Sequence, residues 1–207
     1  MHMPTGTRTR RAGGTRRNDV LAAVVGVLAE RGYENTRFAD VSAASGVAIS
    51  TLQNYFGSRE DMLIESMRRA TDLEVSALEA VAGAKSQPWN RLVALIDRNL
   101  TTPVTVHVLL IEFWRAGIRD SELRDYGEEV WRRYAEPFVR TVIEGCDAGE
   151  FTPSGNPEDI VELLLRSLAG AMFPEVLRFQ ARSESTFRTL LLEQLTAALG
   201  ITDEVGA

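Results

Sequence analysis

Residues 36–61 read TRFADVSAASGVAISTLQNYFGSRED, and this stretch decides the fold. It holds two short segments with apolar residues at helical spacing, joined at Ser45-Gly46-Val47. Gly46 favours the left-handed conformation that a tight turn between helices requires. Ser58 opens a third segment with the pattern of a capping box, and Thr36 is a candidate cap for the first. The stretch therefore predicts a helix-turn-helix followed by a longer helix, which is typical of a DNA-binding regulator.

The second helix of this pair has the pattern of a recognition helix. Leu52 and Phe56 stand four residues apart and predict two buried anchors on one side. Ile49, Ser50, Gln53 and Asn54 then face away from these anchors. In a major groove, an isoleucine suits a thymine methyl group, and the amide of Gln53 or Asn54 suits adenine.

The segment GVAISTLQNYFGSREDML, which begins at Gly46, resembles the signature of the TetR family of transcriptional regulators. Upstream, Gly32-Tyr33 and residues 36–41 also match, so the resemblance covers about residues 18–65. The matching residues within the segment are Gly46, Val47, Thr51, Leu52, Tyr55, Phe56, Ser58, Glu60 and Leu63.

This resemblance implies a dimer that binds double-stranded DNA and a small-molecule effector. It implies phosphate contacts from Thr51, Tyr55 and Arg59, with Arg37 contributing near the start of the preceding helix. The full set of expected DNA-binding residues is Arg37, Ala48, Ile49, Ser50, Thr51, Gln53, Asn54, Tyr55 and Arg59.

The segment departs from the family pattern at four positions. Ala48 stands where a capping Ser or Thr is usual, Ile49 replaces a Lys or Pro, Gln53 replaces a Tyr, and Arg59 replaces a Lys. Loss of a helix cap typically costs about 1 kcal/mol, so we expect the recognition helix to be frayed until it binds. The first three departures also motivate an alternative function, a helical interaction protein that has lost sequence-specific DNA binding.

Charge is unevenly distributed along the 207 residues. Residues 1–60 carry eight arginines and five acidic residues, whereas the remainder carries fifteen basic and twenty-four acidic residues; the whole chain has a net charge of −6. A basic amino-terminal end on an acidic body is expected if only that end meets DNA phosphate. Residues 1–17 hold five of these arginines and no acid, and they predict a disordered basic arm that becomes ordered on DNA.

The whole chain predicts an all-α fold of about nine helices. A helix from Asn18 completes a three-helix DNA-binding domain over residues 18–61, and residues 62–207 form a helical effector-binding and dimerisation domain. Apolar spacing and helix-start signals predict the later helices near residues 62–82, 89–100, 104–118, 121–148, 157–177 and 186–199.

Two sets of residues are candidates for function in this body. Aromatic residues gather on the sixth and seventh predicted helices, which favours an aromatic-lined effector pocket, while the alternative for each residue is a place in the core. The candidates are His107, Phe113, Trp114, Trp131, Tyr134 and Phe138. The eighth helix is apolar nearly all round, and the resemblance implies that the last two helices pair with a second copy. The candidates for this dimer interface are Leu164, Leu168, Met172, Phe173, Phe187 and Leu191.

Several other classes of function are disfavoured. The chain shows no Ser/His/Asp, Cys/His, paired-carboxylate or phosphate-loop pattern, so we do not expect an enzyme. Its single cysteine, Cys146, and two histidines have no metal-site spacing, and no cofactor is expected. The most apolar window, residues 104–114, is too short to span a bilayer, and no signal peptide opens the sequence. We therefore expect a cytoplasmic transcriptional repressor, released from a near-palindromic operator by a small molecule.

Overall fold

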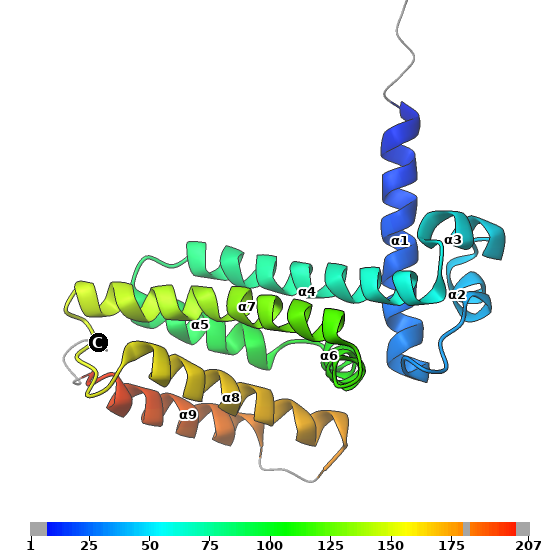
Figure 1. The fold of residues 1–207 in the computed structure, drawn as a ribbon. Helices are drawn as coiled ribbons and strands as arrows, with labels where there is room; N and C mark the ends of the chain where they lie inside the picture. The colour runs from blue at the N-terminus through cyan, green and yellow to red at the C-terminus, as the bar shows by residue number, and fades with distance from the viewer. Residues whose placement is uncertain (1–7, 180–182, 202–207) are drawn as a thin grey trace, which may run out of the picture. The chain divides into compact units, whose positions relative to one another are not determined.

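The computed structural model describes residues 8–179 and 183–201, and within these ranges it contains nine α-helices and no β-strand (Figure 1). The predicted all-α class is confirmed. The helices are α1 (Arg8–Arg31), α2 (Phe38–Ser45), α3 (Ile49–Phe56), α4 (Arg59–Gly83), α5 (Pro88–Leu100), α6 (Val104–Gly117), α7 (Ser121–Asp147), α8 (Pro157–Val176) and α9 (Glu184–Ala198). In the described part of the chain, no helix combines the length and apolar character needed to cross a bilayer.

The helices pack into two units. The first, here called unit 1, contains the described residues up to Asp72 together with Val108–Asp125. Unit 2 contains Leu73–His107 and the described residues from Tyr126 onward. Unit 1 is thus larger than the predicted DNA-binding domain, because it takes in the first turns of α4 and most of α6.

Unit 1 is built on α1, which packs against α2, and α2 packs against α3. The apolar stripe of α1 supplies Val20, Leu21, Val24 and Leu28, each at most 3% exposed. From the later helices, Val41, Leu52, Met62, Leu63 and Met67 are completely buried. This core fixes the three helices on which the expected DNA-binding residues lie.

Helix α1 begins earlier than the sequence predicts. It starts at Arg8 rather than Asn18, so the helix includes residues 8–17 of the segment predicted as an arm, and residues 1–7 lie outside the described part. The apolar stripe, from which the start was predicted, is confined to the second half of the helix. The first half continues the same backbone hydrogen-bonding pattern without apolar residues to bury.

Side-chain caps define several helix ends. The N–H of Asp61 donates to Ser58 Oγ at 3.0 Å, as predicted for α4, and the N–H of Glu158 donates to Asn156 Oδ1 at 2.9 Å at the start of α8. Thr36 does not cap α2. Its hydroxyl instead donates to the carbonyl of Gly32 at 2.9 Å, and the Asp40 carboxylate accepts from the Arg37 N–H at the start of α2.

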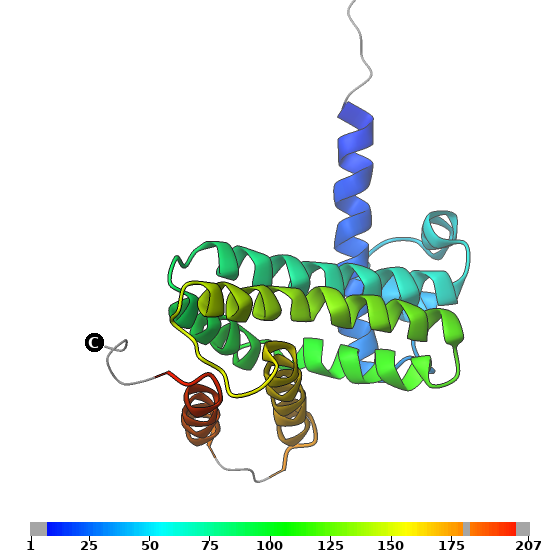
Figure 2. The same cartoon turned by 60° about the vertical axis from the view of Figure 1, so that its left-hand side comes forward.

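Unit 2 has its own hydrophobic core, with α8 at its centre. Helix α5 packs against α8, and α8 and α9 lie side by side (Figure 2). The buried residues come from α4, α5, α7, α8, α9 and the loop before α8: Leu78, Ala82, Leu92, Leu95, Ile96, Phe138, Val142, Phe151, Val161, Leu164, Leu165, Leu168, Leu195 and Leu199. This core determines which faces of α8 and α9 remain available to a ligand or a partner.

Candidate nucleic-acid interface and effector pocket

The turn between α2 and α3 has the geometry expected from its sequence. Gly46 is left-handed, with φ of 66°, and its N–H donates to the carbonyl of Ser42 at 3.0 Å. The N–H of Val47 donates to Ser45 Oγ at 3.3 Å, and the Val47 side chain is buried. The turn therefore holds α2 and α3 in a helix-turn-helix.

Helix α3 presents a polar face to solvent. Leu52 and Phe56 are its buried residues, as predicted. On the other side, Ser50, Gln53 and Asn54 are exposed, and Ile49 is 41% exposed. Thr51 and Tyr55 are partly buried between the two faces, and the Tyr55 ring packs edge-on against Phe56. The exposed side chains form one surface of a size that enters a major groove.

The start of α3 lacks a side-chain cap. Ala48 occupies the N-cap position and is exposed, and its carbonyl accepts hydrogen bonds from the N–H groups of Thr51 and Leu52 at 2.9 and 3.1 Å. Side-chain caps satisfy N–H groups of the first turn, which Ala48 cannot do. The start of α3 therefore has no side-chain cap, as expected from Ala48 in place of a Ser or Thr.

Arg17 holds the other end of α3. Its Nη2 donates to the Tyr55 carbonyl at 3.1 Å and to Glu65 Oε2 of α4 at 2.6 Å. The guanidinium also lies over the Phe56 ring, 5.3 Å from its centroid. One arginine thereby joins α1, α3 and α4. The sequence assigned this residue to a disordered arm, because no apolar periodicity upstream of Asn18 indicates a helix there.

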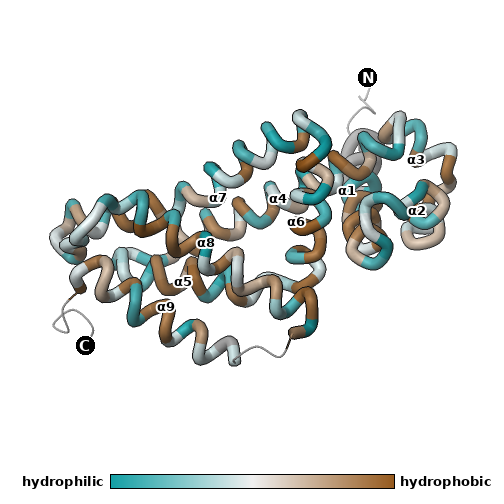
Figure 3. The backbone as a smooth tube through the Cα atoms, turned by 60° about the horizontal axis from the view of Figure 1, so that its bottom comes forward, coloured by the Kyte–Doolittle hydropathy of each residue, from teal (hydrophilic) through white to brown (hydrophobic). Residues whose placement is uncertain are grey.

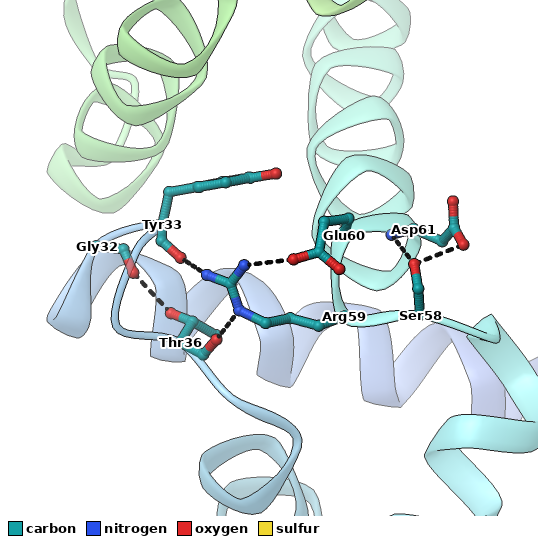
Figure 4. Close-up of polar contacts among 7 residues, drawn as sticks. All are labelled: Gly32, Tyr33, Thr36, Ser58, Arg59, Glu60 and Asp61. Atoms are coloured by element: carbon teal, nitrogen blue, oxygen red, sulfur yellow. Dashed lines mark hydrogen bonds and ion pairs between the residues drawn. The ribbon is translucent and has the colours of Figure 1, made fainter. Parts of the chain in front are cut away.

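Arg59 is engaged inside unit 1 rather than directed outward (Figure 4). Its Nε donates to the Thr36 carbonyl at 2.6 Å, its Nη2 donates to the Tyr33 carbonyl, and its Nη1 pairs with Glu60 at 2.9 Å. Its guanidinium lies 5.2 Å from the centroid of the Tyr33 ring. These bonds make Arg59 a link between α4 and the α1–α2 turn, which disfavours the phosphate contact expected from the sequence. Arg37, by contrast, is exposed at the start of α2.

The α1–α2 turn is also joined to α6. The carboxylate of Glu112 accepts from the N–H of Tyr33 at 2.7 Å and from Arg115 at 2.9 Å. Burial alone would raise the pKa of Glu112, but the hydrogen bonds from Arg115 and Tyr33 lower it below its usual value of 4.5. Gly32 allows this approach, because a Cβ on it would stand 3.3 Å from the carboxylate.

Unit 2 contains a pocket of about 420 Å³, which is within the size range of small-molecule sites. Its lining comes from α5, α6, α8, the residues after α8, and α9: Asn99, Leu100, His107, Leu168, Ala171, Met172, Pro174, Glu175, Phe179 and Phe187. His107 is nearly buried, and its Nδ1 lies 2.9 Å from Glu175 Oε2. In the described part of the chain, no group of three or more His, Cys, Asp or Glu side chains is arranged to hold a metal ion.

Residues 20–65 match the family model described as bacterial regulatory proteins, tetR family. Residues 20–65 therefore carry the DNA-binding segment of the TetR family. The matched range covers the helix-turn-helix, Arg59 and the first turn of α4. It thus includes every side chain of the candidate DNA-binding surface.

Individual relatives extend the similarity along this chain. It is 23% identical over 188 residues to the HTH-type transcriptional repressor KstR2 of Mycobacterium tuberculosis (strain H37Rv), covering 90% of this chain and 92% of that protein. A transcriptional regulator from Saccharomonospora viridis, solved in complex with choline, superposes with a TM-score of 0.79 at 22% identity, over 87% of this chain and 95% of that one. FadR from Bacillus subtilis, solved in complex with stearoyl-CoA, gives a TM-score of 0.71 at 22% identity, over 89% and 99%. At these identities the two solved structures establish the fold.

Few of the residues that the sequence predicted for effector binding line this pocket of unit 2. Of the six effector candidates only His107 lines it. Phe138 is completely buried, and Trp131 and Tyr134 pack against the core of unit 2. Asn99 donates to the hydroxyl of Tyr134, and burial raises the pKa of Tyr134 to about 12. Phe113 and Trp114 belong to unit 1, where Phe113 is buried and Trp114 is 39% exposed.

The candidate dimer residues differ in how exposed they are. Leu164, Leu168 and Met172 are at most 5% exposed within the single chain, which corrects their assignment to an interface. Leu191 packs against the unit 2 core, and Phe187 lines the pocket. Phe173 is 42% exposed and stays a candidate. Three further apolar residues are exposed here and were not among the candidates: Leu163 on α8, Leu177 directly after it, and Leu190 on α9. Figure 3 shows hydrophobic segments along both helices.

Proposed function

We propose that this protein is a homodimeric transcriptional repressor that binds a near-palindromic DNA operator and is released from it by a small-molecule effector. The observation that carries the proposal is the polar outer face of α3, held by the two buried anchors Leu52 and Phe56 within the segment that matches the TetR family. A helix with these properties is what major-groove recognition requires.

In this proposal the DNA-binding residues have two roles. Ala48, Ile49, Ser50, Gln53 and Asn54 face the base edges, because they are exposed on α3 or at its start. Phosphate contacts come from Arg37, Thr51 and Tyr55, which flank that surface. Arg17 and Arg59 act indirectly, since their hydrogen bonds fix the helices that carry these side chains.

Residues 18–61 would form the DNA-binding domain, with residues 62–207 serving effector binding and dimerisation. Exposed apolar residues on α8 and α9 support a dimer, because their burial against a second copy is favourable. Two recognition helices then read half-sites about 34 Å apart, one helical turn of DNA. The operator should therefore be nearly palindromic.

The pocket of unit 2 supports effector binding, and two structural neighbours were solved with choline and with stearoyl-CoA. An effector that binds one conformation of the dimer more tightly than the DNA-bound one shifts the population away from DNA. A shift from 1:99 to 99:1 needs a preference of about 10⁴-fold between the two conformations. The relative named as a repressor supports repression as the outcome, and a DNA-bound regulator of this kind would act in the cytoplasm without catalysing a reaction.

Selection of bound duplexes from a random DNA pool, with the purified protein at moderate salt, tests this function. We expect enrichment of a palindrome with two half-sites, and log affinity for that palindrome should fall steeply with log salt. A second selection after addition of candidate effectors should show the loss of enrichment. Failure to enrich any sequence under either condition would contradict the proposal and favour the alternative of a helical interaction protein.

A further inference from the structure

The lining of the unit 2 pocket carries an unbalanced charge. Glu175 is its acidic residue, and among the described residues that line it there is no Lys or Arg. Two arginines on the neighbouring helices α5 and α9 are held in ion pairs. Arg98 lies 2.5 Å from Glu74, and Arg188 lies 2.5 Å from Asp97. The pocket therefore offers no charge partner among these residues for a carboxylate or a phosphate, and it disfavours an anionic ligand.

The carboxylate of Glu175 and the side-chain carbonyl of Asn99 offer hydrogen-bond acceptors to a ligand in the pocket. An ionised carboxylate only accepts, so the 2.9 Å contact with Glu175 places the His107 proton on Nδ1. Asn99 uses its NH₂ group to donate to Tyr134, which leaves its carbonyl oxygen as the acceptor. A complementary ligand must accordingly bring hydrogen-bond donors.

The remaining lining is apolar and partly aromatic. Leu100, Leu168, Met172 and Pro174 supply aliphatic and thioether surface, and Phe179 and Phe187 supply two rings. Aromatic rings attract cations as well as apolar groups, so they suit the same ligand that the carboxylate favours. A volume of about 420 Å³ limits that ligand to a compact molecule.

We infer that the effector of this pocket is a protonated amine with a compact apolar body. Its ammonium group donates to Glu175 and to the carbonyl oxygen of Asn99, and its apolar part lies against Phe187, Leu168 and Met172. This inference rests on the proposed function for its regulatory meaning. The binding itself is a property of unit 2.

Titration calorimetry of the full-length protein without DNA tests the inference. The cationic probes are phenethylamine and n-octylamine, and 3-phenylpropanoate and octanoate are anions of similar size and apolar body. We expect the amines to bind, and each carboxylate to bind at least about tenfold more weakly than the amine of similar shape. Equal or tighter binding of the carboxylates, or no binding of either amine, would overturn the inference.

A pair of variants on α8 tests whether Glu175 supplies the negative charge that binds the amine. Glu175→Gln keeps the shape and an acceptor for His107, and we expect it to weaken amine binding at least about tenfold. Glu162→Gln is the matched control, because Glu162 lies on the same helix outside the pocket and pairs with Arg166 at 2.8 Å. Thermal unfolding of both variants checks that they fold. An amine affinity that Glu175→Gln leaves unchanged would also contradict the inference.

Failure of the inference and failure of the proposed function are separable in this design. A palindrome enriched in the DNA selection, with carboxylates preferred in calorimetry, would refute the amine and leave the regulator in place. Amine binding that depends on Glu175, with no DNA sequence enriched, would support the ligand class and refute the regulator.

Discussion

The carboxylate of Glu112 accepts a 2.7 Å hydrogen bond from the backbone N–H of Tyr33, which joins α6 to the turn leading into α2. The carbonyl of the same residue accepts from Arg59 at the start of α4. Both backbone groups of Tyr33 are thus taken by long-range partners. Because the turn sets the position of α2, the geometry of the helix-turn-helix depends on side chains of α4 and α6.

Glu112→Gln should make unit 1 less stable, in a pH-dependent way. The pKa of Glu112 is lowered by its hydrogen bonds with Arg115 and Tyr33, so its ionised form is favoured by folding. That stability is present above the usual value of 4.5 and is lost as pH falls through the lower, folded-state pKa. Urea unfolding from about pH 7 to about pH 3 should show the wild-type advantage shrinking with acid. Glu122→Gln removes a carboxylate that is 77% exposed and serves as the control; a constant advantage of wild type over Glu112→Gln would contradict the prediction.

Arg59→Gln should lower the stability of the fold and leave the phosphate contacts with DNA unchanged. Loss of its bonds to the Thr36 and Tyr33 carbonyls is expected to reduce the free energy of unfolding by about 1–3 kcal/mol. The slope of log DNA affinity against log salt should not change. Exposed Arg37 offers the matched comparison: Arg37→Gln should leave stability within about 0.5 kcal/mol and lower that slope by about 1. If the two variants exchange these effects, the roles assigned here are reversed.

Asn54→Ala should relax base preference at one position in each half-site. Asn54 is exposed on α3, and an amide that contacts adenine contributes about 1–3 kcal/mol of discrimination against other bases. Repeating the duplex selection with the variant measures this directly. A motif that keeps all its positions would show that Asn54 does not face a base.

Tyr55→Phe should weaken binding to all sequences to a similar degree. The substitution keeps the ring that packs against Phe56 but removes the hydroxyl proposed to contact phosphate. The expected loss is about tenfold or more for each duplex, with the selected motif unchanged. A loss confined to one sequence would instead assign Tyr55 to base recognition.

Phe173→Glu should dissociate the dimer. The side chain is 42% exposed on α8, so a charge there costs little in the isolated chain but is buried in the proposed interface. Sedimentation velocity should show monomer at concentrations where wild type is dimeric. Ile118→Glu, at a residue 75% exposed in unit 1, is expected to leave the dimer intact. Equal behaviour of the two variants would place the interface elsewhere.

The parts of the fold that the sequence predicted well depend on local signals. Gly46 and the Ser58 cap act within a few residues of the chain, and the buried pair Leu52 and Phe56 follows from helical spacing. These features do not depend on distant partners. The helix-turn-helix and the boundaries of most helices could therefore be predicted from the chain alone.

The functional surfaces of unit 2 depend on distant partners, and there the sequence was a poor guide. Helix α8 is apolar nearly all round, so spacing cannot tell that Leu164 and Leu168 face the core while Phe173 faces solvent. Aromatic residues marked α6 and α7 as candidates for the pocket. Phe138, however, packs in the core, and Glu175, whose charge distinguishes the pocket, carried no signal in the sequence.

The contacts of Arg17 have a practical consequence for engineering this protein. A truncation meant to remove the basic amino-terminal segment, if it extends through Arg17, also removes the side chain that bridges Tyr55 and Glu65 over the ring of Phe56. Such a shortened chain would lose phosphate attraction and loosen its recognition helix at once, and the two losses would be confounded in any affinity measurement. A deletion that ends before Arg16 keeps the bridge, so the contribution of the segment itself can then be measured.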